Sequence, residues 1–161
     1  MQSRVGKTKL RWISSVRLIS RGKHTTETLS AFLTKEKVNP DLILSSCAVR
    51  ARETIQPILR LTRLPSELRF DERIYEATAE KLLDVVRQIE KAARSVLIVG
   101  HNPGLEELLG FLTGRSETLP PGALARITFK DSNWNNIGAE AGILEWLVKP
   151  KELEKAQRSW L

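Results

Sequence analysis

The strongest constraint on the fold is residues 96–104, which read Val-Leu-Ile-Val-Gly-His-Asn-Pro-Gly. A short, continuous apolar run is typical of a strand that is buried on both faces of a parallel sheet. The Pro-Gly pair, followed by apolar residues at helical spacing from Leu105 to Leu112, predicts a helix over about 104–113. His101 therefore lies just past the carboxyl end of a central strand, where open α/β sheets bind their ligands.

A histidine at this place is a candidate functional residue. Because it titrates near physiological pH, its imidazole can bind an anion, accept a proton or act as a nucleophile. The structural alternative is a polar side chain that caps the strand-to-helix turn. The position of His101 favours the functional interpretation.

Strand and helix patterns alternate along the rest of the chain. Helices are expected over about 25–35, 49–61 and 79–93. Pro57 should bend or interrupt the second of them, and a short terminal helix should begin at Lys149-Pro150. Further strands are expected over 41–46, 123–129 and 142–148, whereas 66–78 has the composition of a connection. Repeated strand–helix units predict an α/β fold with three α/β/α layers and a mostly parallel central sheet.

The composition narrows the class of protein. A chain of 161 residues with a hydrophobic fraction of 41% fits a single globular domain over residues 1–161. The one cysteine, Cys47, excludes an internal disulfide and fits a reducing compartment. No apolar stretch is long enough for a membrane span or a secretory signal, so we expect a cytoplasmic protein. The absence of a Cys/His cluster or a glycine-rich nucleotide loop predicts neither a metal nor a cofactor.

The formal net charge of +7 raises the possibility of nucleic-acid binding. The basic residues are spread along the chain and often alternate with glutamates, as in residues 35–37 and 151–155. Such mixed runs are usually solvated helix faces, and no basic strand rich in aromatic residues is present. Nucleic-acid binding is therefore a minor alternative.

A second motif, residues 44–54, reads Leu-Ser-Ser-Cys-Ala-Val-Arg-Ala-Arg-Glu-Thr and also passes from a strand through a tight turn into a helix. We expect it to reach the same edge of the sheet as His101. An arginine in the first turn of a helix can hold two phosphate oxygens while backbone N–H groups add to the anion site. Arg50 and Arg52 are two residues apart and point in different directions, so at most one faces the pocket.

Together these segments resemble the histidine phosphatase superfamily, with its phosphoglycerate mutase-like fold, and within it the small SixA-type phosphohistidine phosphatases. The family carries Ser-Ser-x-x-x-Arg-Ala-x-x-Thr, which residues 45–54 reproduce, and Val-Gly-His-Asn-Pro, which residues 99–103 reproduce. The pair Arg21-Gly22 corresponds to the one that opens the family's first helix. The resemblance covers about residues 17–148 and implies that Arg50 clamps a phosphate that His101 also stabilises.

The family's nucleophile has no counterpart in the expected place. Its first strand ends in Leu-x-Arg-His-Gly or Leu-x-Arg-His-Ala, and this histidine becomes phosphorylated. The best local match is residues 10–15, in which Arg11 is a candidate phosphate ligand and Trp12 replaces the nucleophile. An indole has no lone pair with which to attack phosphorus. The other histidine, His24, falls on the expected first helix, so residues 1–16 are atypical for the family.

Three interpretations of the function follow. The resemblance implies a phosphatase that acts on phosphohistidine in a protein or on a small phosphomonoester. The missing nucleophile instead predicts a catalytically inactive relative that binds phosphate or a phosphoprotein. A third interpretation is an N-terminus altered by a misplaced start or a frameshift before about residue 16, in a chain that is otherwise an ordinary enzyme.

The resemblance also makes Glu76 a candidate catalytic residue. Mutase and acid phosphatase branches of the superfamily use an acidic residue in this loop as the proton donor, and Glu76 lies in Tyr-Glu-Ala at 75–77. The alternative is a loop glutamate that pairs with an arginine. The small size of the chain and the lack of a large insertion between the 41–46 and 96–99 strands predict an open pocket, which suits a phosphohistidine on a protein surface. The sequence leaves the oligomeric state undetermined.

Overall fold

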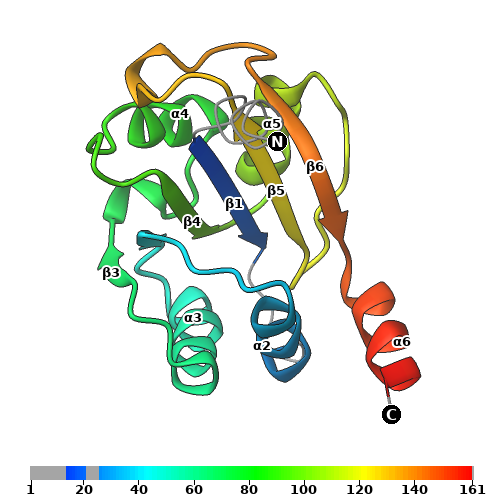
Figure 1. Ribbon diagram of the computed structural model, residues 1–161. Helices are drawn as coiled ribbons and strands as arrows, with labels where there is room; N and C mark the ends of the chain where they lie inside the picture. Colours follow the sequence, from blue (N-terminus) through cyan, green and yellow to red (C-terminus); the bar gives the residue numbers. More distant parts are fainter. Residues whose placement is uncertain (1–13, 21–25, 161) are drawn as a thin grey trace, which may run out of the picture.

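The centre of the molecule is a six-stranded sheet with the strand order β3-β2-β4-β1-β5-β6 (Figure 1). The computed structural model describes residues 14–20 and 26–160, with side chains over residues 26–155. The strands are β1 (Ser14–Ser20), β2 (Leu42–Ser45), β3 (Glu67–Phe70), β4 (Ser95–Gly100), β5 (Leu124–Phe129) and β6 (Gly142–Val148). The first four strands are mutually parallel, and β5 is antiparallel to both β1 and β6.

Helices cover both faces of this sheet (Figure 1). They are α2 (Thr26–Lys35), α3 (Val49–Thr62), α4 (Ala79–Arg87), α5 (Gly104–Thr113) and α6 (Pro150–Trp160), with short 3-10 helices η1 (Glu72–Ile74) and η2 (Trp134–Asn136). Apolar side chains of α2, α3 and α6 pack on one face, and those of α4 and α5 pack on the other. The expected three-layer α/β/α fold with a mostly parallel sheet is confirmed. None of the described helices combines the length and the apolar content needed to cross a membrane.

Strand β4 shows why the apolar run at 96–99 fixes the centre of the fold. Val96 and Ile98 belong to the hydrophobic cluster beneath α4 and α5, whereas Leu97 and Val99 belong to the cluster beneath α2 and α3. All four side chains are fully buried. The run is apolar throughout because both of its faces lie in a core, and α5 begins and ends where the sequence predicts.

Two expected elements differ from the structure on the β3 side of the sheet. Residues 67–70, expected to be part of a connection, form the edge strand β3, which pairs with β2. The helix expected over 79–93 ends at Arg87. The apolar period continues beyond that point because Ile89 and Ala93 are still buried, in turns that bond Ile89 N–H to Val86 O and Ala93 N–H to Glu90 O. Helix α3, in contrast, continues through Pro57 without interruption.

The first strand lies later in the chain than the sequence comparison predicts. The match at residues 10–15 required a strand that ends near Leu10, but β1 spans Ser14–Ser20. Its register runs from Ser15 beside Ser95 to Ser20 beside Gly100, so its carboxyl end is Ser20. The expectation that Trp12 stands in the nucleophile's place is therefore wrong, because that place follows the carboxyl end of the strand. Arg11 and Trp12 themselves lie outside the described residues.

Candidate functional site: a buried serine–histidine pair at the carboxyl edge of the sheet

The carboxyl ends of β2 and β4 lie next to each other and carry the two sequence motifs. Ser45 is the register partner of Val99, and the next residue, Ser46, donates its backbone N–H to the Val99 carbonyl at 2.9 Å. The Oγ of Ser46 lies 2.7 Å from Nε2 of His101. Both side chains are buried, Ser46 completely and His101 with 7% exposure. The two motifs therefore meet in a direct hydrogen bond at one edge of the sheet.

The orientation of the His101 ring is set by more than this bond. Ser46 Oγ also accepts the Ala48 N–H at 3.2 Å, which fixes the hydroxyl between the turn and the imidazole. The Tyr75 ring stands edge-on to His101, with centroids 5.8 Å apart and an interplanar angle of 79°. Tyr75 is 52% exposed, so it forms part of the outer wall beside the buried histidine. The contacts of His101 with Ser46 and with Tyr75 are not apparent from the sequence, although the Ser-Ser motif at 45–46 marks Ser46 itself.

Arg50 lies in the first turn of α3, immediately after this turn. Its side chain is exposed, and no described residue bonds to its guanidinium. The backbone carbonyl of Arg50 accepts the Thr54 hydroxyl at 2.9 Å. Arg52 differs, because its Nε donates to the Cys47 carbonyl at 3.0 Å and its guanidinium lies 4.1 Å from the centroid of the Phe70 ring. Of the two arginines, Arg50 is the one whose donors remain available for a ligand.

The N-terminus of α3 adds positive potential at this point. Its first turn contains no acidic residue, and Ala48 at the N-cap supplies no side-chain hydrogen bond. The partial positive charge of a helix N-terminus is therefore not offset locally. Helix α5 also begins near His101, but Glu106 and Glu107 lie in its first turn, and Glu106 accepts the Leu119 N–H at 2.7 Å. An anion is therefore favoured at the N-terminus of α3 and disfavoured at the N-terminus of α5.

The loop after β3 brings Tyr75 and Glu76 to the same edge. The Asp71 N–H donates to the Ser45 carbonyl at 2.8 Å, and the Asp71 carboxylate caps η1 by accepting the Arg73 N–H at 2.9 Å. The side-chain hydrogen bond from Arg73 lowers the pKa of Asp71. Glu76 follows in the left-handed region at φ 46° and is exposed. No arginine among the described residues pairs with it, and its role as a proton donor stays a prediction.

Three adjacent strand ends thus supply the predicted residues. The ends of β3, β2 and β4 lead to Glu76, Arg50 and His101, respectively. Arg11 is not among them, since it precedes β1 and lies outside the described residues.

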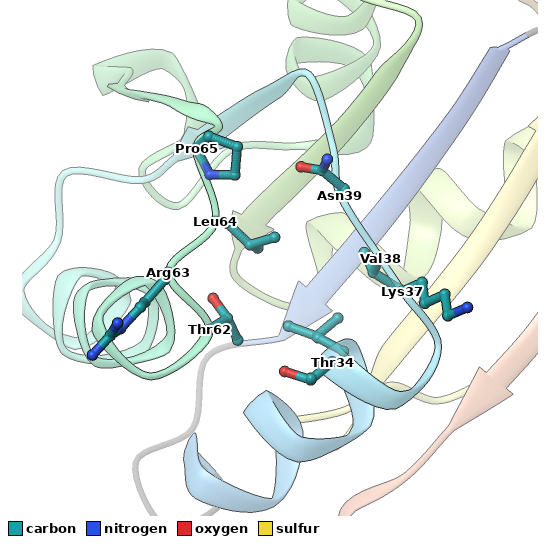
Figure 2. A pocket seen from close by; sticks show the side chains of 9 residues that line it. Thr34, Lys37, Val38, Asn39, Thr62, Arg63, Leu64 and Pro65 are labelled. Atoms are coloured by element: carbon teal, nitrogen blue, oxygen red, sulfur yellow. The ribbon is translucent and has the colours of Figure 1, made fainter.

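A separate hollow lies at the opposite end of the strands. It has a volume of about 380 Å³ and is lined by residues around the C-terminal ends of α2 and α3, which precede β2 and β3 in the chain. Figure 2 shows Thr34 and Thr62 facing this space, while the Arg63 side chain points away from it. The hollow contains none of the residues of the two motifs.

Comparison with known proteins bears on the fold. No family model matches the sequence, and no curated protein matches it either. Solved structures do match: a proposed phosphohistidine phosphatase SixA from Agrobacterium tumefaciens gives a TM-score of 0.72 at 22% identity, over 85% of this chain and 98% of that one. Phosphoglycerate mutase from Plasmodium falciparum gives 0.59 at 16% identity, over 83% and 89% of the two chains. The chain has the phosphoglycerate mutase-like fold.

A third structure with the phosphoglycerate mutase-like fold is the protein histidine phosphatase SixA complexed with tungstate. Its TM-score is 0.69 at 19% identity, and the match covers 86% of this chain and 99% of that chain. The phosphoglycerate mutase-like fold expected from the two motifs is thus confirmed over most of the chain.

Proposed function

We propose that the carboxyl edge of the sheet binds a phosphoryl group, and that the chain is a member of the histidine phosphatase superfamily that acts on phosphohistidine or a phosphomonoester. The observation that carries this proposal is the hydrogen bond of 2.7 Å between Ser46 and His101, which unites the two motifs beside Arg50. The phosphatases among the structures of similar fold support the same assignment.

The residues at this edge have the chemistry that a phosphoryl group requires. The planar guanidinium of Arg50 can donate two parallel hydrogen bonds to phosphate oxygens, and the backbone N–H groups at the start of α3 can donate more. An imidazolium at His101 would add another charged donor. Each charge-assisted bond contributes about 1.5–3 kcal/mol where water is partly excluded. In phosphoryl transfer, such donors stabilise the charge on the equatorial oxygens.

The second candidate is a relative that binds the phosphoryl group without hydrolysing it. It is favoured by the end of β1 at Ser20. This boundary aligns Arg21 and Gly22 with the His-Gly of the family's Arg-His-Gly rather than with the pair that opens its first helix, the correspondence expected from the sequence. A guanidinium stays protonated and has no lone pair for attack on phosphorus, so arginine cannot replace the histidine as nucleophile. Of the two histidines in the chain, only His24 would remain as a candidate.

Binding and turnover are tested in parallel on the purified chain. Tungstate affinity is measured by calorimetry for the wild type, Arg50→Ala, His101→Ala and the matched control Arg52→Ala. We expect Arg50→Ala to weaken tungstate binding at least about tenfold, the equivalent of one charge-assisted hydrogen bond. Arg52→Ala should have a much smaller effect because Cys47 and Phe70 already hold that side chain. Equal effects of the two arginine substitutions would refute a site at Arg50.

Hydrolysis of a phosphohistidine mimic, together with acid-labile phosphate retained on the protein, separates the two candidates. A phosphatase hydrolyses the mimic and loses that activity in His101→Ala. A non-hydrolysing relative binds tungstate but does not turn over the mimic. If Arg21→His then restores both hydrolysis and acid-labile phosphate, the loss of the nucleophile accounts for the inactivity.

A further inference from the structure

The outward face of α3 carries an unusual concentration of arginines. Residues 49–63, which comprise α3 and its C-cap, contain four arginines and one acidic residue, Glu53. Arg52, Arg60 and Arg63 are all exposed. Arg52 and Arg60 are eight residues apart, which places them on one side of the helix, and Arg63 follows at its C-cap. At 1.5 Å of rise per residue this row is about 16 Å long. It begins next to Arg50 and continues away from the phosphoryl site.

Among the residues whose side chains are described, 26–155, no ion pair neutralises the charges in this row. Elsewhere on the surface, Arg69 pairs with Glu67 and Glu90, and Arg73 pairs with Asp71. No described acidic side chain pairs with Arg60 or Arg63. Arg52 is held by the Cys47 carbonyl and the Phe70 ring but keeps its positive charge. A row of exposed cations of this kind attracts an acidic partner and increases the rate of encounter with it.

Apolar side chains accompany the arginines. Val49 is 69% exposed and Leu61 is 57% exposed, and these are the most exposed large hydrophobic side chains among the described residues. Both belong to α3, Val49 in its first turn and Leu61 in its last. Val49, three residues before Arg52, lies on the face of the arginines, whereas Leu61 lies on its flank. An exposed apolar residue beside such charges is typical of a surface that binds another protein.

We propose that the outward face of α3 is a docking surface for an acidic protein segment. The opposite charge of such a segment complements Arg52, Arg60 and Arg63, and its apolar side chains can cover Val49. A nucleic acid fits less well, because α3 contains no aromatic residue on which a base could stack. This docking surface does not depend on phosphoryl binding at Arg50, although a segment bound there would lie beside that site.

The probe is a fluorescein-labelled peptide of eight glutamates, and its binding to the full chain is followed by fluorescence anisotropy at low salt. The test variant is the double substitution Arg60→Glu with Arg63→Glu. The control is Lys81→Glu with Lys91→Glu, which makes the same change in net charge with exposed lysines on and just after α4, on the opposite face of the sheet. We expect the affinity for the peptide to fall at least about tenfold in the test variant and less than about threefold in the control.

Three results would overturn the proposal. One is no measurable binding of the peptide, and another is an equal loss in the test and control variants, which would reflect net charge alone. The third is tighter binding of an equally charged single-stranded oligothymidylate, which would assign the surface to nucleic acid. Tungstate affinity is measured on the same samples, and Arg60→Glu with Arg63→Glu should leave it unchanged. Peptide binding without tungstate binding would leave the docking surface intact and refute the phosphoryl site.

Discussion

Two glycines of α5 should respond oppositely to substitution by alanine, and the comparison tests how tightly the candidate site is packed. Neither Gly104 nor Gly110 has a positive φ, so alanine can adopt the backbone conformation at both positions. In a helix interior alanine is favoured over glycine by up to about 1 kcal/mol. At Gly110 a new Cβ would meet nothing closer than the Arg115 carbonyl, at 3.7 Å. We therefore expect Gly110→Ala to stabilise the protein by about 0.5–1 kcal/mol.

Gly104 is different because its Cβ would overlap the Ala77 carbonyl oxygen and lie 3.2 Å from Leu82 Cδ1. Ala77 offers main-chain atoms rather than a flexible side chain, and Leu82 is 1% exposed, so neither neighbour can yield easily. Overpacking of this kind costs about 1–3 kcal/mol, which exceeds the gain in helix propensity. We expect Gly104→Ala to destabilise the protein by about 1–2 kcal/mol, opposite in sign to Gly110→Ala.

Urea unfolding followed by tryptophan fluorescence gives the free energy of unfolding of both variants. A new Cβ at position 104 would push on Ala77, and the same loop carries Tyr75, which contacts His101. Gly104→Ala should therefore weaken tungstate binding, and Gly110→Ala should not. If Gly104→Ala proved as stable as Gly110→Ala, the packing of α5 against the Tyr75 loop would be looser than described and the reasoning would fail.

Three further predictions concern single side chains. Ser46→Ala removes the hydrogen bond to His101 Nε2 and should lower the tungstate affinity measured by calorimetry about three- to tenfold. Ser45→Ala should leave that affinity unchanged, because Ser45 Oγ donates to the Ser46 carbonyl and not to His101. Trp134→Phe leaves the Ala93 carbonyl without its partner at 2.7 Å and should cost about 1–3 kcal/mol in urea unfolding, more than Trp146→Phe at its half-buried position. The hydrogen bond from Arg69 lowers the pKa of Glu90 from 4.5 to about 2, so the pair stabilises the native state above about pH 4.5 and this contribution is lost as the pH falls towards 2. The difference in Tm between the wild type and Glu90→Gln should therefore shrink over that range, and a constant difference would contradict it.

The elements that the sequence predicts well are those whose pattern is local. The uninterrupted apolar run of β4 and the Pro-Gly start of α5 contain their own signals, and both elements appear where expected. The turns that carry His101 and Arg50 are predicted by the same kind of local signal, a strand pattern that ends just before a helix pattern. The sequence therefore predicts the candidate site at the carboxyl edge of the sheet, although it does not predict the hydrogen bond between Ser46 and His101.

The elements that the sequence does not reveal depend on distant partners. Strand β3 contains alternating charges and is only four residues long, and it is held by its pairing with β2 and by the ion pair of Arg69 with Glu90. Strand β1 carries Arg17 at its centre and serines at its ends, which is poor material for a central strand by composition. It occupies that place because β4 and β5 pair with it on both sides.

The way in which β1 is held has a consequence for how a protein of this kind can change over evolutionary time. Its register with β4 and β5 is made by main-chain groups of Ser14–Ser20 and does not depend on which side chain follows the strand. A substitution just past the carboxyl end can therefore change the chemistry at this place without removing a single bond of the sheet. Under the proposed function, the residues that bind a phosphoryl group follow β2 and β4 whereas the nucleophile follows β1, so binding and turnover can be lost independently during evolution.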